Sequence, residues 1–101
     1  MRALLLVLAL PLAAHAEQPL GTAQAPWGHA SIFDSPCKAE AVLKQIPDKM
    51  RPSFKRAHVY HEGKNYKACW TEVSPTVVFL IDEAGDQGPV PRAAFAKPTK
   101  S

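Results

Sequence analysis

Two cysteines, Cys37 and Cys69, have the clearest chemistry in this chain. They lie too far apart for a CxxC motif, which makes a reactive thiol pair or a metal site a weak interpretation. In an oxidising compartment, two thiols of a small domain usually pair with each other. We therefore expect a Cys37–Cys69 disulfide, which closes a loop of 33 residues when both cysteines are counted.

His58 and His61 are the obvious metal candidates. Residues three apart on a strand point to opposite faces, so these rings could bind one ion only if the following turn began early. The helical spacing typical of zinc enzymes is absent. Asp82 and Asp86 flank an acidic turn that lacks the spaced ligands of a calcium loop. We predict no metal ion and no other cofactor.

Nucleophilic catalysis needs a serine or cysteine beside a base and an orienting group. Both cysteines are assigned to the disulfide, and no serine lies in a strained, glycine-flanked turn. We therefore expect no catalytic residue and no enzymatic activity.

Basic and acidic residues are unevenly distributed. Seven lysines and arginines lie between positions 44 and 67 with two acidic residues, whereas four acidic and no basic residues lie between 72 and 86. Aromatic residues interleaved with cations can stack on sugars or contact an acidic protein, although a mixed solvated surface is the plainer interpretation. The candidate partner-binding residues are Lys55, Arg56, Tyr60, Lys64, Tyr66 and Lys67. Trp70 is expected in the core instead.

The N-terminal sixteen residues have the three parts of a secretory signal peptide. A positive start at Met1-Arg2 precedes an apolar stretch, and small residues at Ala14 and Ala16 mark a cleavage site. The apolar run ends at Pro11, short of the roughly 20 residues that span a bilayer. We expect cleavage after Ala16, no stable membrane anchor afterwards, and a periplasmic or secreted location.

Cleavage would leave 85 of the 101 residues, enough for one small domain that a disulfide would help to stabilise. Loss of Arg2 would lower the formal net charge from +3 to +2, which is too little to indicate a nucleic-acid partner. We divide the remaining chain into a flexible leader at 17–30, a single domain at 31–96 and a polar tail at 97–101. Trp27 in the leader either docks on the domain or awaits a partner.

The first ordered element of the domain is predicted to be a helix. Ser35 is a good N-cap, Pro36 fits the first helical position, and apolar residues from Ala39 to Ile46 follow the spacing of a buried helical face. Pro47 would end this helix.

Three strands are expected after the helix, at 54–61, 65–73 and 76–82. Gly63 favours a hairpin between the first two strands, and the continuous apolar run from Val77 to Ile81 suggests a central strand buried on both faces. Phe95 would then plug the core. These elements predict an α+β fold, in which one N-terminal helix packs on a small antiparallel meander sheet of three to four strands.

Two resemblances accompany this interpretation. A cysteine on a short helix, Ala68-Cys69-Trp70 after a tyrosine-bearing hairpin, and the Gly85–Gly88 turn before Phe95 resemble small uncharacterised exported proteins of proteobacteria and their prophages. That resemblance implies no activity. The segment from Gly88 to Phe95 is loosely similar to the closing signature of SH3-like barrels, which makes an SH3-like small barrel the alternative fold.

The sequence thus favours a non-enzymatic binding module in the periplasm or outside the cell. Its partner would be a protein or an envelope polyanion bound by the basic hairpin, with Trp27 as a further contact. The alternative is an inhibitor of an envelope hydrolase or a phage-borne exclusion factor, which would insert a loop such as 82–88 into an enzyme cleft.

Overall fold

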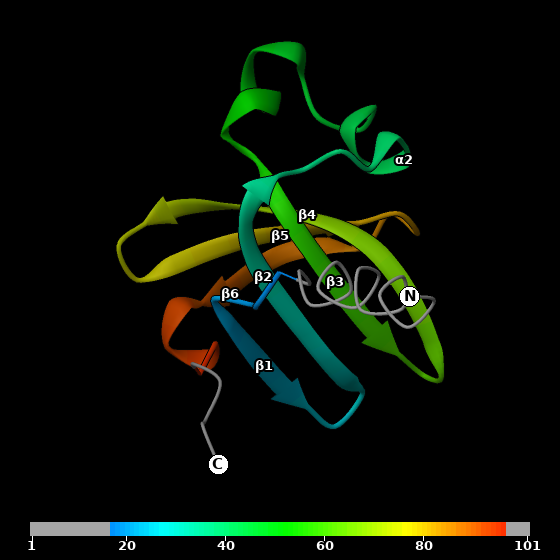
Figure 1. Ribbon diagram of the computed structural model, residues 1–101, viewed down its shortest axis with the longest axis vertical. Helices are drawn as coiled ribbons and strands as arrows, with labels where there is room; N and C mark the ends of the chain where they lie inside the picture. The colour runs from blue at the N-terminus through cyan, green and yellow to red at the C-terminus, as the bar shows by residue number, and fades with distance from the viewer. Residues whose placement is uncertain (1–16, 97–101) are drawn as a thin grey trace, which may run out of the picture.

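The computed structural model describes residues 17–96, and its strands form one antiparallel sheet (Figure 1). Each strand pairs with the next along the chain, so the sheet is a six-stranded meander. The strands are β1 (Gly21–Ala25), β2 (Gly28–Pro36), β3 (Lys55–His61), β4 (Lys64–Ser74), β5 (Val77–Asp82) and β6 (Gln87–Pro91). The predicted signal peptide at Met1–Ala16 and the polar tail at 97–101 lie outside the described residues.

The helices within residues 17–96 are short. They are α2 (Glu40–Leu43), the 3-10 helix η2 (Asp48–Ser53) and the 3-10 helix η3 (Arg92–Ala94). The first two form an insertion between β2 and β3 that projects from one end of the sheet (Figure 1). No helix within residues 17–96 is long and apolar enough to cross a membrane.

The sheet curls into a half-barrel whose edges meet at one point. Thr22 on β1 pairs with Ala96 beyond η3, through N–H···O bonds of 2.9 and 3.2 Å. Gly21 permits this approach, because a Cβ there would lie 2.7 Å from the carbonyl oxygen of Phe95. The curl gives the sheet a concave and a convex face.

Each face has its own apolar core. Trp70 and Phe95 fill the concave face at the end where the sheet closes, and the Trp70 indole Nε1–H donates to the carbonyl of Phe33 over 2.8 Å. The other members of the concave core are Ala23, Ala30, Ile32, Ala57, Val59, Ala68 and Val78. On the convex face, Cys37, Val42, Ile46 and Phe54 of the insertion pack against Cys69 on β4 and Ile81 on β5.

The expected disulfide is present. Cys37, immediately after β2, is bonded to Cys69 on β4, and both side chains are buried in the convex core. The bond therefore ties the start of the insertion to the middle of the sheet.

The predicted α+β fold with an N-terminal helix on a three- to four-stranded sheet is wrong. β2 continues to Pro36, and Ser35 donates its hydroxyl to Glu17 instead of capping a helix. The amide of Cys37 then bonds the carbonyl of Phe54, so the chain stays extended where the helix was expected to begin. Only Glu40–Leu43 of the expected helix become α-helical, because the chain then tightens into i→i+3 bonds from Gln45 to Val42 and from Ile46 to Leu43 before it reaches Pro47.

Two further expectations differ from the structure. The segment predicted as a flexible leader at 17–30 contains β1 and the start of β2, which add two strands to the sheet. The run Val77–Ile81 does form β5, but the centre of the sheet is occupied by β3 and β4. The alternative of an SH3-like small barrel also fails, since residues 17–96 form one six-stranded meander curled into a half-barrel, with a single isolated bridge between Thr22 and Ala96.

Other local predictions are confirmed. Three of the strands match the runs expected at 54–61, 65–73 and 76–82. The β3–β4 turn places Glu62 and Gly63 at φ 49° and 82°, the left-handed pair typical of a two-residue hairpin. Phe95 is buried in the concave core.

Replacing both cysteines, Cys37→Ala with Cys69→Ala, should lower the free energy of unfolding by about 3.7 kcal/mol, the chain-entropy value for a loop of this length. Urea denaturation of the oxidised wild-type and variant proteins measures the difference. The reduced wild-type protein is the control and should resemble the variant. Equal stability of all three forms would contradict a stabilising role for the bond.

Candidate binding sites on the two faces of the sheet

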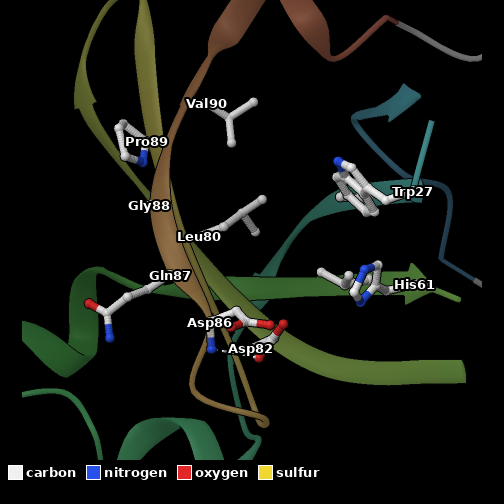
Figure 2. Close-up of a pocket in the computed structure, with 11 residues that line it drawn as sticks. Trp27, His61, Leu80, Asp82, Asp86, Gln87, Gly88, Pro89 and Val90 are labelled. Atoms are coloured by element: carbon white, nitrogen blue, oxygen red, sulfur yellow. Dashed lines mark hydrogen bonds between the residues drawn. The ribbon is translucent and has the colours of Figure 1, made fainter. Parts of the chain in front are cut away.

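The concave face is hollow at the end away from Trp70 and Phe95. Its floor consists of short or aliphatic side chains, including Ala30, Val59 and Leu80, which leave a groove of about 290 Å³. The turns β1–β2, β3–β4 and β5–β6 all lie at this end of the meander. Figure 2 shows the groove, whose lining residues are Trp27, Ala30, Val59, His61, Leu80, Asp82, Asp86, Gln87, Gly88, Pro89 and Val90.

One wall of the groove is aromatic. Trp27 belongs to the turn between β1 and β2, and 44% of its surface is exposed. Its indole lies edge-on to the imidazole of His61, with the ring centroids 5.6 Å apart (Figure 2). Trp27 is therefore docked on the sheet while a large part of its ring remains accessible.

The opposite end of the groove is acidic. Asp82 is only 7% exposed, and its Oδ1 accepts N–H bonds from Ala84 at 2.8 Å and Asp86 at 3.1 Å. These bonds shape the tight β5–β6 turn. Asp86, with an exposed side chain, lies beside Asp82 in the groove (Figure 2).

The two outer strands of the sheet, β1 and β6, do not pair with each other, and the groove lies on this open side. In an antiparallel pair, hydrogen-bonded and non-hydrogen-bonded residue pairs alternate. The bonds from Asp82 N–H to Asp86 O and from Arg92 N–H to Thr76 O fix this alternation for β5 and β6, and they put Pro89 and Pro91 in non-hydrogen-bonded pairs. Pro89 and Pro91 consequently turn their nitrogens, which carry no hydrogen, toward the outer edge of β6. The half-barrel thus stays open beside Trp27.

A second pocket of about 270 Å³ lies on the convex face, and its lining is basic. Lys38, Arg56 and Lys67 surround it together with His58, and the disulfide cysteine Cys37 lies in its wall. The remaining lining residues are Ala39, Ala57 and Ala68. Lys38 follows the disulfide cysteine, whereas the other cations come from the β3–β4 hairpin.

The cations of this pocket differ in their surroundings. Arg56 forms an ion pair of 2.8 Å with Glu17, and its guanidinium carbon lies 3.8 Å from the centroid of the Phe33 ring. Lys38 and Lys67 form no ion pair with any residue between 17 and 96, although the Glu83 carboxylate accepts the backbone N–H of Lys67. Arg56 is thus held in place, and two ammonium groups remain available.

The six predicted partner-binding residues do not form one surface. Arg56 and Lys67 line the basic pocket, and Tyr60 lies on the same face, stacked on His29 at 5.2 Å. The other three belong to the concave side of the hairpin by alternation. Lys55 pairs with Asp34 at 2.6 Å, Lys64 is exposed at the turn, and Tyr66 packs against the concave core.

The two candidate metal-binding histidines are separated by the sheet. His61 lines the concave groove and His58 the convex pocket, so they cannot bind one ion together. Within residues 17–96, no group of three or more His, Cys, Asp and Glu side chains is arranged to hold a metal.

Sequence reasoning missed Lys38 and the role of Asp82. Lys38 falls within the predicted helix, and no local pattern indicates that it lies beside Arg56 and Lys67 of the hairpin. The sequence shows the acidic turn, but that Asp82 and Trp27 line the same groove depends on the curl of the sheet.

The Glu17–Arg56 ion pair gives a testable titration. Hydrogen bonds from Arg56 and, second, from Ser35 lower the pKa of Glu17 below its usual value. A lowered folded-state pKa stabilises the fold above the pKa of the unfolded chain, and that stability is lost as the pH falls through the folded-state pKa. In Arg56→Gln the Glu17 pKa should rise toward its usual value, measured by NMR of the carboxyl carbon. Lys55→Gln, which removes the neighbouring pair with Asp34, should leave it unchanged; an unchanged pKa in Arg56→Gln would refute the pairing.

Comparison with known proteins does not add to these observations. No protein-family model, no curated protein and no solved structure matches the chain. Functional inference therefore depends on the chemistry of the two sites.

Proposed function

We propose that the protein is an exported, non-enzymatic binding module that holds an anionic polymer of the cell envelope on its convex face. The observation that carries this proposal is the convergence of Lys38, Arg56 and Lys67 around one pocket. Positive side chains attract a polyanion over a distance and release its counterions on contact.

The geometry of the pocket supports recognition of anionic groups. Arg56 is oriented by Glu17 and by the ring of Phe33, so little conformational entropy would be lost when it donates to an oxyanion. Lys38 and Lys67 supply further charge from two different elements, which suits a ligand with repeated anionic groups. Glu17 offsets part of the charge of Arg56, so the pocket would attract a single small anion only weakly. A polymer that makes several such contacts at once would be held more tightly.

Export is part of the proposal. The signal-like pattern at Met1–Ala16 supports it, as does the buried Cys37–Cys69 bond, because disulfides persist mainly in oxidising compartments. The location would be the periplasm or the medium.

The inhibitor alternative has less support. The segment from Asp82 to Gly88 is a short turn held by Asp82 Oδ1 and by a 2.9 Å bond from Glu83 N–H to the carbonyl of Lys67. The turn exposes only the five residues Glu83–Gln87, which is little surface to insert into an enzyme cleft.

Processing can be tested directly. The protein recovered from a secretion-competent bacterial host should begin at Glu17 and have the mass of the disulfide-bonded form, as determined by N-terminal sequencing and intact mass spectrometry. Alteration of Ala14 and Ala16 to bulky residues should retain the precursor, because small side chains are required at the cleavage site. A cell-associated protein that keeps Met1 and two free thiols would overturn the export proposal.

Binding to a polyanion can be tested with charge-reversal variants. Lys38→Glu with Lys67→Glu should weaken binding of dextran sulfate at least tenfold and lower the dependence of affinity on salt, measured by isothermal titration calorimetry. Lys44→Glu with Lys49→Glu is a matched control, since these exposed lysines lie outside the pocket and undergo the same change of net charge.

Neutral dextran provides the second control and should not bind. An equal loss of affinity in both double variants would mean that net charge alone drives binding and would contradict a role for the pocket. Unchanged affinity in the Lys38/Lys67 variant would contradict it as well.

A further inference from the structure

The groove on the concave face has a different chemistry from the basic pocket. A ligand bound there would be separate from the polyanion of the proposed function. We infer that it binds a small organic cation, whose ammonium group contacts Asp82 while its apolar body lies against Trp27. Three features carry this inference: a buried carboxylate without a counter-cation, an accessible aromatic wall and an aliphatic floor.

Asp82 is the central observation. A carboxylate that loses most of its contact with water is stabilised by hydrogen bonds and by a nearby cation. Oδ1 of Asp82 has two N–H partners, whereas Oδ2 has no hydrogen-bond partner among residues 17–96. No Lys, Arg or His nitrogen of the described chain lies within 4.0 Å of either carboxylate oxygen.

Oδ2 is accessible from the groove. Within residues 17–96, every side-chain nitrogen or oxygen that is fully sealed from solvent has a hydrogen-bond partner. An unpartnered Oδ2 must therefore have some contact with solvent, and Asp82 lines the groove. An ammonium group entering there would supply both the hydrogen bond and the positive charge that the protein does not.

The aromatic wall and the aliphatic floor of the groove favour a ligand whose remaining part is apolar. Trp27 presents an exposed indole on which a cation or an apolar ring can lie, and the edge-on contact with His61 supports its position. Ala30, Val59, Leu80 and Val90 offer only aliphatic contacts. The volume of about 290 Å³ fits a compact ligand, since a cavity of roughly 150 Å³ already accepts benzene.

The same features exclude other ligand classes. An anion would meet the carboxylates of Asp82 and Asp86 at the end of the groove. A neutral molecule could occupy the apolar part but would leave Oδ2 without a cation. The groove is therefore expected to distinguish ligands of one shape by their charge.

Three probes of similar shape test this expectation: 2-phenylethylammonium, 2-phenylethanol and phenylacetate. Each is titrated into the oxidised protein and followed by the ¹H–¹⁵N NMR spectrum. The ammonium probe should bind at least tenfold more tightly than the alcohol, with the largest shifts at Trp27, His61 and residues 82–90. Phenylacetate should not bind.

Variants of the groove separate charge from shape. Asp82→Asn keeps an Oδ1 acceptor for the turn but removes the charge, so it should abolish the preference for the ammonium probe over the alcohol. Gly88→Leu should block all probes, because a Cβ at Gly88 meets nothing within 4 Å and the longer side chain would occupy the groove. Ser74→Leu, at the opposite end of the sheet, is the control for added apolar surface.

Equal affinity for the ammonium and alcohol probes, or shifts outside the groove, would overturn the inference. An Asp82→Asn protein that keeps the preference would do so too. If that variant fails to fold, as judged by circular dichroism, the probe series and Gly88→Leu decide the question. Lys38→Glu with Lys67→Glu should leave ammonium binding intact, so this site and the basic pocket can fail independently.

Discussion

The backbone bonds between Thr22 and Ala96 are the constraint on which the curl of the sheet and its concave groove depend. They bring the first strand to the end of the chain and bend a meander that could otherwise remain an open sheet. Phe95, one residue away, enters the concave core beside Trp70. The large side chains thus occupy one end of the half-barrel, and the short side chains at the other end leave the groove.

The disulfide has the corresponding role on the convex face. By joining Cys37 to Cys69, it holds the beginning of the insertion against β4 and places Lys38 beside cations of the hairpin. The two sites consequently have opposite charge and lie on opposite faces of the same strands. β3 contributes to both sites, because residues an odd number of positions apart on a strand, such as His58 and His61, face opposite sides of the sheet.

Local rules predicted β3, β4, β5 and the β3–β4 turn, because the signals of a strand run and of a glycine at positive φ act within a few residues. They failed for the residues around Ser35, where capping preference was outweighed by pairing of β2 with β3. The strand at Gly21–Ala25 was missed because its short side chains show little amphipathic pattern. The candidate cations Arg56 and Lys67 were recognised from composition, but Lys38 and the groove required long-range contacts that no local pattern encodes.

The two prolines of β6 have a consequence for association. An exposed strand edge normally offers amide hydrogens to a neighbouring chain and thereby invites fibrous aggregation. Pro89 and Pro91 remove those donors along most of the edge that borders the groove. The groove can therefore remain open to solvent beside β6. The edge of β6 is at the same time a poor template for a β-strand from another copy of the chain.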